Sequence, residues 1–314
     1  MYRFLSMNVT FRQLRLFKVF SETCSVTASA KQMHITQPTA SMQLKELANA
    51  VGIPLFEIVG KKIYLTEAGK SLASTANSIS KEWESFEQTI SSMKGLETGS
   101  LRIAVVSTAK YFIPGLLGTF CAEHKDVDIS LEVLNRDAVI ARLEENLDDM
   151  AIMTQPPYHL DIEDEVFLDN PLVCIAPKSH PLIDRKLNLA DLINEDFIIR
   201  EVGSGTRMFC DVFFQKNKFE PKIRLMLGSN EAIKQSVAGG LGLSIVSIHS
   251  LTENDLKDTL TILNISELPI NSQWHIVTLK GRKLSPIARV FHDHLIKKGS
   301  EISLNTEKFT YKQP

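Results

Sequence analysis

The segment G-S-G-T-R at 203–207 combines residue types that bind anions. It precedes a predicted helix over 206–216, so free backbone N–H groups and the positive end of the helix dipole point to one place. The glycines permit close approach of a ligand, and the arginine can pair with a carboxylate or a phosphate. Ser107 and Thr108 form a second such helix start, with Lys110 nearby. The alternative for both segments is that their hydroxyls are ordinary helix caps.

An alternation of predicted strands and helices after residue 100 positions these segments. The alternation predicts an α/β domain with parallel strands covered by helices. In such sheets, ligands bind beyond the carboxyl ends of the strands, against helix N-termini. The predicted strands cover 101–106, 127–134, 149–153, 172–176, 197–199, 223–227, 240–247 and 274–279, and the predicted helices cover 111–124, 138–146, 206–216, 230–238 and 286–298. The loops expected to carry a ligand are Ser107-Thr108, Thr154-Gln155, 203–207 and Ser229-Asn230.

The first 52 residues predict three helices in the order of a helix-turn-helix. Ser25 and Thr36 are the predicted caps of short helices over 26–33 and 37–49. Pro38 is tolerated because it falls in the first turn, where N–H groups have no helical partner. An apolar stripe predicts an earlier helix over about 10–23, and its members are Phe11, Leu14, Phe17 and Phe20.

The third helix is predicted to present a polar face to base edges in the major groove of DNA. Its outward residues, with the cap before it, are Thr36, Gln37, Pro38, Thr39, Ser41, Met42 and Lys45. Glutamine can read adenine, and a lysine can reach a phosphate. Two short predicted strands over 55–59 and 63–66 flank Lys61 and Lys62, whose charges suit a wing on the DNA backbone. The alternative for this pair is an ordinary solvated turn.

The charge of the chain is unevenly distributed. The 314 residues carry a net charge of −2 and are 44% hydrophobic, which excludes wholesale disorder and a polycation that coats nucleic acid. Residues 1–66 nevertheless hold eight Lys or Arg against three Glu. No apolar run is long enough to span a membrane, and the N-terminus lacks the features of a secretory signal, so we expect a cytoplasmic protein without a membrane partner.

The four cysteines lie far apart and form no C-x-x-C pair. We therefore expect no metal site and no disulfide scaffold. Buried, reduced thiols are the expectation for Cys24, Cys121, Cys174 and Cys210. A redox switch at Cys210 is the alternative, because this residue follows the polar loop at 203–207.

A long polar helix is predicted from Thr66 to about Leu96. Its apolar residues alternate in spacings of three and four, which is typical of the a/d seam of a coiled coil. The seam residues are Ala76, Ile79, Trp83, Phe86, Ile90 and Met93. Such a stripe needs a partner, which is either a second copy of the chain or another part of the same chain.

The N-terminal region closely resembles the DNA-binding domain of the LysR-type transcriptional regulators. The matching segments, in order, are FRQLRLFKVF, TASAKQMHITQPTASMQLKELANAVGIPLFE and IYLTEAGK. The resemblance implies a winged helix-turn-helix that binds double-stranded promoter DNA. It also implies a homodimer through the linker helix, pairing of dimers into a homotetramer, and RNA polymerase as a further partner. Two positions that are often arginine in the family are Met42 and Ile58 in this chain.

The remainder resembles the LysR effector domain, which has the two-lobed fold of periplasmic binding proteins. VVSTAKYFIPGLLGTFC, NRDAVIARLEENLDDMAIMTQPP and VGSGTRMFCDVFF are similar to the Calvin-cycle operon regulators of the CbbR type. This similarity implies control of carbon-fixation or central carbon metabolism genes by an effector, either a phosphorylated metabolite or NADPH. The effector is expected near Ser107, Thr108, Gln155, Gly203, Ser204, Gly205, Thr206 and Arg207. Where many relatives have G-R-P-P, this chain has T-Q-P-P at 154–157.

The expected organisation has three parts: a winged helix-turn-helix domain over 1–66, a linker or dimerisation helix over 67–98, and an effector-binding domain over 99–314. Within the last part, lobe I is expected to comprise about 99–168 and 270–299, and lobe II about 169–269. The polar tail at 300–314 is predicted to be disordered.

There are three alternatives to this function, one within the same family and two in other classes of protein. A LysR regulator of another pathway, such as amino acid, aromatic or redox metabolism, is the alternative within the family. An enzyme is not expected, because the motifs G-x-S-x-G, H-E-x-x-H and G-x-x-x-x-G-K-[ST] are absent from the sequence. A solute-binding protein would leave residues 1–66 without a role.

Overall fold

The structure is a computed structural model that describes residues 8–60, 62–93 and 99–310, with side chains for all of these except 88, 91–93 and 303–310. Two compact units make up the chain: residues 1–90 with 145–147, and residues 91–144 with 148–314. Most of the linker helix therefore belongs to the first unit. No helix within the described ranges is long and apolar enough to cross a membrane.

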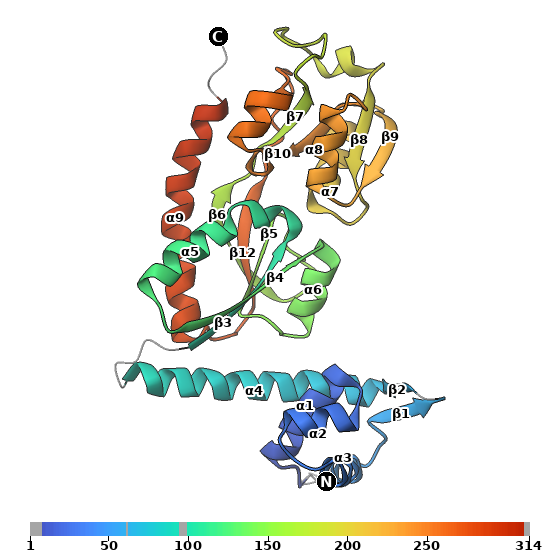
Figure 1. The fold of residues 1–314 in the computed structure, drawn as a ribbon, viewed down its shortest axis with the longest axis vertical. Helices are drawn as coiled ribbons and strands as arrows, with labels where there is room; N and C mark the ends of the chain where they lie inside the picture. Colours follow the sequence, from blue (N-terminus) through green and yellow to red (C-terminus); the bar gives the residue numbers. More distant parts are fainter. Residues whose placement is uncertain (1–7, 61, 94–98, 311–314) are drawn as a thin grey trace. The chain divides into compact units, whose positions relative to one another are not determined.

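The first unit combines a helix-turn-helix, a hairpin and a long helix (Figure 1). Its elements are α1 (Phe11–Thr23), α2 (Val26–Gln32), α3 (Gln37–Val51), β1 (Phe56–Val59), β2 (Lys62–Leu65) and α4 (Glu67–Met93). The side chains of Thr10, Ser25 and Thr36 accept backbone N–H groups as helix caps, as the sequence predicts for the last two. The helices enclose a buried core of Leu16, Phe17, Phe20, Ala30, Ala40, Leu44, Leu47 and Leu55.

The segment L-T-E-A-G joins the hairpin tightly to α4. Thr66 Oγ1 accepts a hydrogen bond from the N–H of Gly69 at 3.1 Å and donates one to the carbonyl of Pro54 at 2.8 Å. A Cβ atom at Gly69 would lie 1.8 Å from the carbonyl oxygen of Leu55, so this close approach requires glycine. The junction fixes where α4 begins relative to the hairpin.

Lobe I of the second unit is a five-stranded sheet in the order β4-β3-β5-β12-β6. Its elements are β3 (Gly99–Val106), the short 3₁₀ helix η1 (Ser107–Tyr111), α5 (Ile113–Glu123), β4 (Val127–Leu134), α6 (Arg136–Glu144), β5 (Met150–Met153), β6 (Ile162–Asp169), β12 (Gln273–Leu279) and α9 (Pro286–Thr310). β3 is parallel to β4 and β5, whereas β12 is antiparallel to β5 and β6. The expected parallel sheet is thus mixed, because the chain re-enters lobe I from lobe II through β12.

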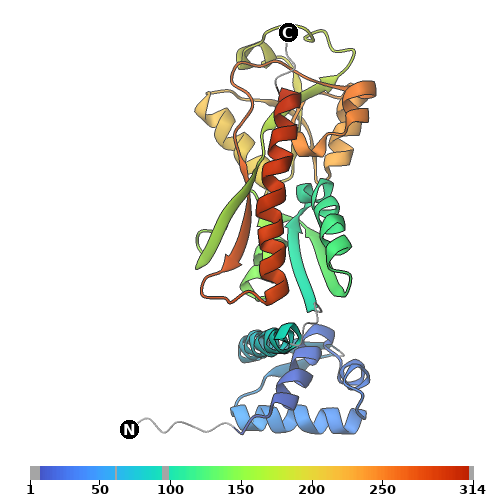
Figure 2. The same ribbon diagram turned by 90° about the vertical axis from the view of Figure 1, so that its left-hand side faces the viewer.

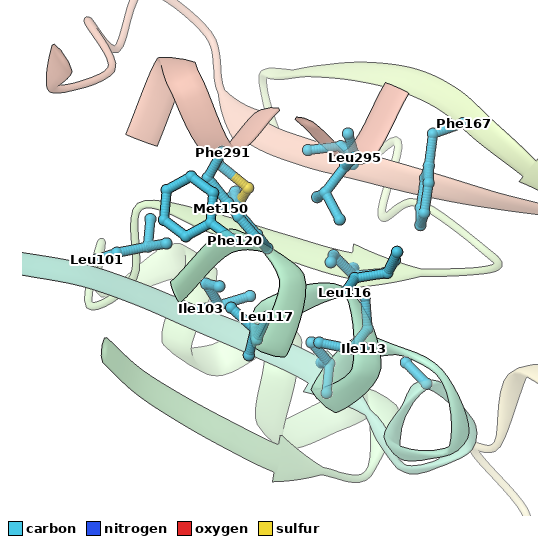
Figure 3. Packing of buried hydrophobic residues seen from close by; sticks show 14 of the residues in the cluster. Leu101, Ile103, Ile113, Leu116, Leu117, Phe120, Met150, Phe167, Phe291 and Leu295 are labelled. Atoms are coloured by element: carbon cyan, nitrogen blue, oxygen red, sulfur yellow. The ribbon is translucent and has the colours of Figure 1, made fainter. Parts of the chain in front are cut away.

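Both faces of the lobe I sheet are covered by helices. Alternate residues of a strand point to opposite faces, so Leu101 and Ile103 pack against α5 and α9, whereas Ala104 packs against α6. The rings of Phe120 in α5 and Phe291 in α9 meet edge to face, with centroids 5.0 Å apart. Figure 3 shows these apolar side chains gathered between the two helices and the sheet.

The prediction of a disordered tail from residue 300 is wrong for the described part of it, because α9 continues to Thr310. Figure 2 shows α9 as one long helix. Its extension is held by packing: Ile302 lies against the lobe I core. A Cβ atom at Gly299 would lie 1.9 Å from the carbonyl oxygen of Phe167, so the helix passes very close to β6.

Lobe II contains an antiparallel sheet, β10-β7-β11, and a parallel pair, β8-β9. Its elements are β7 (Leu172–Pro177), η2 (Leu189–Leu192), β8 (Asp196–Arg200), α7 (Gly205–Lys216), β9 (Lys222–Leu227), α8 (Asn230–Ala238), β10 (Ser244–Ser247), η3 (Ile248–Ser250), the π-helical turn η4 (Asp255–Thr259) and β11 (Leu260–Ile262). α7 contributes Phe213 to one apolar cluster and α8 contributes Ile233 to another, so the two helices cover different faces.

Two chain segments cross between the lobes side by side. The N–H of Asn170 donates to the carbonyl of Ser272 at 2.8 Å, and Asn170 Nδ2 donates to Ser272 Oγ at 2.8 Å. Leu172 and Ile270 pair next to them. This paired crossover joins the lobes at the edge where the strands β5 and β6 end.

Candidate functional site

The exposed side of α3 carries the residues predicted to meet DNA. Its other side packs on the core, and the predicted residues of this helix that are exposed to solvent are Gln37, Pro38, Ser41, Met42 and Lys45. Thr36 and Thr39 have a structural role: Thr36 Oγ1 accepts the N–H of Thr39 at 3.4 Å, and their hydroxyls lie 2.8 Å apart. These two residues fix the first turn of the helix, from which side chains reach base edges in such motifs.

The hairpin that follows has the shape of a wing. Its turn contains Gly60 with a φ of 65°, a conformation that favours glycine. Lys62 is exposed at the start of β2, and Ile58 is 67% exposed on β1. Lys61, the other predicted phosphate contact, lies outside the described residues.

α4 presents an apolar stripe that its own unit leaves uncovered. Ile79, Trp83 and Phe86 are 38%, 49% and 53% exposed. The Trp83 ring lies 5.6 Å from those of Phe86 and of Phe11 on α1, so the stripe continues onto α1. Ile90 is half-buried, and the Met93 side chain lies outside the described residues. Exposed aromatic patches of this kind are typical of protein interfaces.

The second unit has a cleft between its two lobes, with an empty volume of about 340 Å³ that includes its open mouth. The ends of the lobe I strands meet the start of α7 there. Lobe I contributes Ser107, Thr108, Asn135, Arg136, Thr154 and Trp274, and lobe II contributes Arg200, Glu201, Ser204, Gly205 and Thr206. This position agrees with the rule that α/β sheets bind ligands beyond the carboxyl ends of their strands.

The start of α7 supplies backbone donors to this cleft. Ser204 is buried and caps the helix by accepting the N–H of Arg207 at 3.1 Å. The N–H groups of Gly205 and Thr206 belong to the first turn, where no helical acceptor exists. A Cβ atom at Gly205 would lie 2.6 Å from Thr154 Oγ1, so lobe II approaches lobe I closely here and a larger residue would displace this hydroxyl.

Two arginines and one glutamate leave the cleft with one positive charge. Arg200 is buried and already bound: its Nε and Nη2 donate to the carboxylate of Glu201 at 2.7 and 2.8 Å. Burial opposes ionisation of Glu201, but the hydrogen bond and charge of Arg200 outweigh burial and lower its pKa. Arg136 differs, because within the described part of the chain only its Nε is bound, to the carbonyl of Gln155 at 3.1 Å. Burial lowers the pKa of Arg136, and the charge of Asp137 opposes this effect.

The second predicted anion site, at Ser107 and Thr108, has a different role. No side-chain cap bond begins η1. Instead, Ser107 Oγ accepts a hydrogen bond from Arg200 Nη2 at 3.3 Å, and Thr108 Oγ1 accepts one from Asn230 Nδ2 at 3.1 Å. Lys110 pairs with Glu231 at 2.7 Å. These three residues of lobe I therefore bind lobe II.

Three of the predicted effector residues do not line the cleft. Arg207 donates to Asp211 at 2.7 Å and to the carbonyl of Arg200 at 3.1 Å. Gly203 has a φ of 88° in the turn before α7. Gln155 contributes its carbonyl as the acceptor for Arg136 Nε. These three residues contact neighbouring residues or form the turn before α7, and they do not face the cleft.

The cleft-lining residues that the sequence did not predict include Asn135, Arg136, Asn170, Arg200, Glu201 and Trp274. One signal was available for Asn135 and Arg136: they directly follow the predicted strand over 127–134, at the same edge as the predicted loops. Arg200 and Glu201 likewise follow a predicted strand. Trp274 lies at the start of its strand, so only the antiparallel direction of β12 brings it to this edge.

The cysteines divide into two kinds. Cys24 and Cys121 are exposed, whereas Cys174 and Cys210 are buried in the core of lobe II. The expectation of buried thiols is thus wrong for the first two, which lie at a helix end and on the outer side of α5. Burial raises the pKa of Cys210 to about 12, which is unsuited to a redox switch because the thiolate is the reactive form.

A winged helix-turn-helix unit and a two-lobed α/β domain with a positively charged cleft define a ligand-responsive DNA-binding protein. Residues 11–70 match the bacterial regulatory helix-turn-helix protein, lysR family, and residues 94–300 match the LysR substrate binding domain. The chain belongs to the LysR family and is a LysR-type transcriptional regulator, which confirms the resemblance noted in its sequence.

Comparison with known proteins indicates the subgroup of LysR-type regulators to which the chain is similar. The HTH-type transcriptional activator CmpR of Synechocystis sp. is 41% identical over 298 residues, which are 95% of this chain and 98% of CmpR. The RuBisCO operon transcriptional regulator of Acidithiobacillus ferrooxidans is 42% identical over 289 residues, 92% of this chain and 94% of that regulator. The solved regulatory domain of Synechocystis CcmR in complex with 2-PG is 43% identical, with a TM-score of 0.62 over 64% of this chain and 98% of that domain. Because this chain matches CmpR and a RuBisCO operon regulator over nearly its whole length, it is a regulator of the CbbR and CmpR type.

Proposed function

We propose that this protein controls carbon-fixation genes and that a small phosphorylated anion in the cleft modulates its binding to promoter DNA. The observation that carries the proposal is the group of donors that converge on the cleft. Two kinds of donor there have no acceptor among the described residues. They are the backbone N–H groups of Gly205 and Thr206 and the Nη atoms of Arg136. A helix start beside an arginine is a suitable site for a phosphate.

The size of the cleft favours a small effector over NADPH. Its empty volume of about 340 Å³ already includes the open solvent at its mouth, so the enclosed space is small. The CcmR regulatory domain, 43% identical, was solved with 2-PG, which is 2-phosphoglycolate. We therefore propose 2-phosphoglycolate, or a phosphorylated acid of similar size, as the effector. The proposal assigns no catalytic step to the cleft.

For DNA binding we propose that α3 enters the major groove and that the wing contacts the backbone. The exposed residues Gln37, Ser41, Met42 and Lys45 would then meet bases and phosphates, and Lys62 would meet the backbone. The exposed stripe of Ile79, Trp83 and Phe86 supports a homodimer along α4. Two copies would present two α3 helices to the two halves of an interrupted palindrome.

The test is a mobility-shift titration with promoter DNA from a carbon-fixation operon, with and without 2-phosphoglycolate. We expect the ligand to change the affinity of the wild-type protein for DNA at least about fivefold. Arg136→Ala should abolish this response, whereas Arg185→Ala, which removes an exposed arginine outside the cleft, should retain it. A wild-type protein that binds the DNA but responds to no phosphorylated acid would refute the effector part of the proposal.

A further inference from the structure

Trp274 lines the cleft and carries a buried donor without an acceptor. Its side chain is fully buried, and its indole Nε1 has no hydrogen-bond partner among the described residues. Buried polar groups in folded proteins are nearly always paired, so an exception at the wall of a binding cleft points to a ligand atom. The other tryptophan differs, because Trp83 Nε1 donates to Glu87 at 2.8 Å.

The order of the strands places this donor opposite the arginine of the cleft. Arg136 follows β4, and Trp274 begins β12; β3 and β5 lie between these two strands. Neighbouring strands are about 4.8 Å apart, so β4 and β12 are separated by about 14 Å. Thr154, which follows β5, lies between them and next to Gly205. The cleft therefore has two polar ends, with Arg136 at one and Trp274 at the other.

The indole ring is held in a fixed position by neighbouring rings. Phe112 packs edge-on against it, with centroids 5.0 Å apart, and the His249 ring lies at 6.5 Å. His249 Nε2 is bound to the carbonyl of Asp169 at 2.7 Å. Burial lowers the pKa of His249, although the hydrogen bond to the Asp169 carbonyl and the charge of Asp169 oppose this effect. The N–H of Trp274 is thus a fixed donor in a buried wall, where a hydrogen bond to an anion is strong.

We propose that the indole N–H of Trp274 donates to a carboxylate oxygen of the effector, at the end remote from Arg136 and the start of α7. This inference rests on the proposed function and specifies its ligand class. The phosphate occupies the end with the arginine and the helix N–H groups, which suit the greater charge. The cleft then selects a short acid with a phosphate at one end and a carboxylate at the other.

The first test compares two ligands that differ only in the carboxylate. Binding of 2-phosphoglycolate and of ethyl phosphate to the full chain is measured by titration calorimetry. Trp274→Phe keeps an aromatic ring but removes the N–H. It should weaken the binding of 2-phosphoglycolate about 10-fold to 100-fold and the binding of ethyl phosphate less than twofold. Ser244→Ala is the matched control, because Ser244 Oγ is also buried without a partner but does not line the cleft. It should bind both ligands like the wild type.

A second measurement does not depend on how the variant folds. The chain contains two tryptophans, so 5-fluorotryptophan labelling gives two ¹⁹F resonances. The Trp274 resonance should shift with 2-phosphoglycolate and much less with ethyl phosphate. If the wild type binds 2-phosphoglycolate while Trp274→Phe retains its affinity, or if both ligands are weakened equally, the role of Trp274 is refuted and the proposed function stands. If the wild type binds neither ligand, the effector proposal fails, and this inference fails with it.

Discussion

Asn230 ties the two lobes together through Thr108. Its Nδ2 donates to Thr108 Oγ1 at 3.1 Å, and its Oδ1 accepts from Arg200 Nη1 at 2.8 Å. Asn230, Thr108 and Arg200 are all buried. One side chain at the start of α8 therefore holds both the cleft-lining 3₁₀ helix of lobe I and the buried arginine of lobe II.

Replacing Asn230 with alanine should destabilise the closed arrangement of the lobes. The change leaves Thr108 Oγ1 and Arg200 Nη1 buried without this partner, which costs about 1–3 kcal/mol of unfolding free energy. Urea denaturation followed by circular dichroism measures the loss. Asn194→Ala, at an exposed asparagine of lobe II, should change the midpoint very little. Equal midpoints for the two variants would contradict the role of Asn230.

Lys45→Ala should reduce the salt dependence of DNA binding. A lysine at a phosphate releases about one counterion, so its loss should lower the slope of log K against log salt by about 1. Binding titrations at several salt concentrations measure the slope. Lys125→Ala removes an exposed lysine from the second unit and should leave the slope unchanged. A variant with the wild-type slope would remove Lys45 from the DNA surface.

Trp83→Glu should dissociate the predicted dimer, because it places a charge in the middle of the exposed apolar stripe of α4. Sedimentation velocity should show a smaller species at micromolar concentration. Ser74→Glu adds the same charge at an exposed position off the stripe and should sediment like the wild type. If Trp83→Glu remained dimeric, the interface would have to lie elsewhere.

The pair of Arg200 and Glu201 predicts a specific dependence of stability on pH. The folded-state pKa of Glu201 lies below its usual value of 4.5. Its contribution is therefore present above pH 4.5 and is lost as the pH falls through the folded-state pKa. The wild type should have a higher urea midpoint than Glu201→Gln at pH 7, and the difference should shrink as the pH falls well below the usual value of 4.5. A difference that stayed constant over this range would show that the ionised carboxylate does not act in this way.

The thiols should react in two classes. At pH 8 the exposed Cys24 and Cys121 should react rapidly with a thiol reagent, whereas Cys174 and Cys210 should react only on unfolding. Burial is the cause, since it raises the pKa of Cys210 to about 12 and also raises that of Cys174. Counting the fast thiols by absorbance checks this. Rapid reaction in a chain with Cys24→Ser and Cys121→Ser would contradict the burial of the other two.

The local features of both units follow from residues that are close together in the sequence. Hydroxyl caps such as Ser25 and Thr36 and the periodic apolar residues of α1 act over a few residues, so the helices could be predicted close to their observed bounds. The start of α7 at G-S-G-T-R could be predicted for the same reason, since Ser204 caps it through a contact three residues away. The family motifs are also local, and they identified the class of protein.

The set of side chains that meet in the cleft depends on long-range contacts. Arg136, Arg200 and Trp274 are distant in sequence, and the order and direction of the strands bring them to one edge. Long-range contacts also make Ser107 and Thr108 hydrogen-bond to lobe II. They extend α9 past residue 300, because the helix packs on the lobe I core and passes close to β6 at Gly299. Local patterns cannot specify these outcomes, because the partner that completes each contact comes from a remote part of the chain.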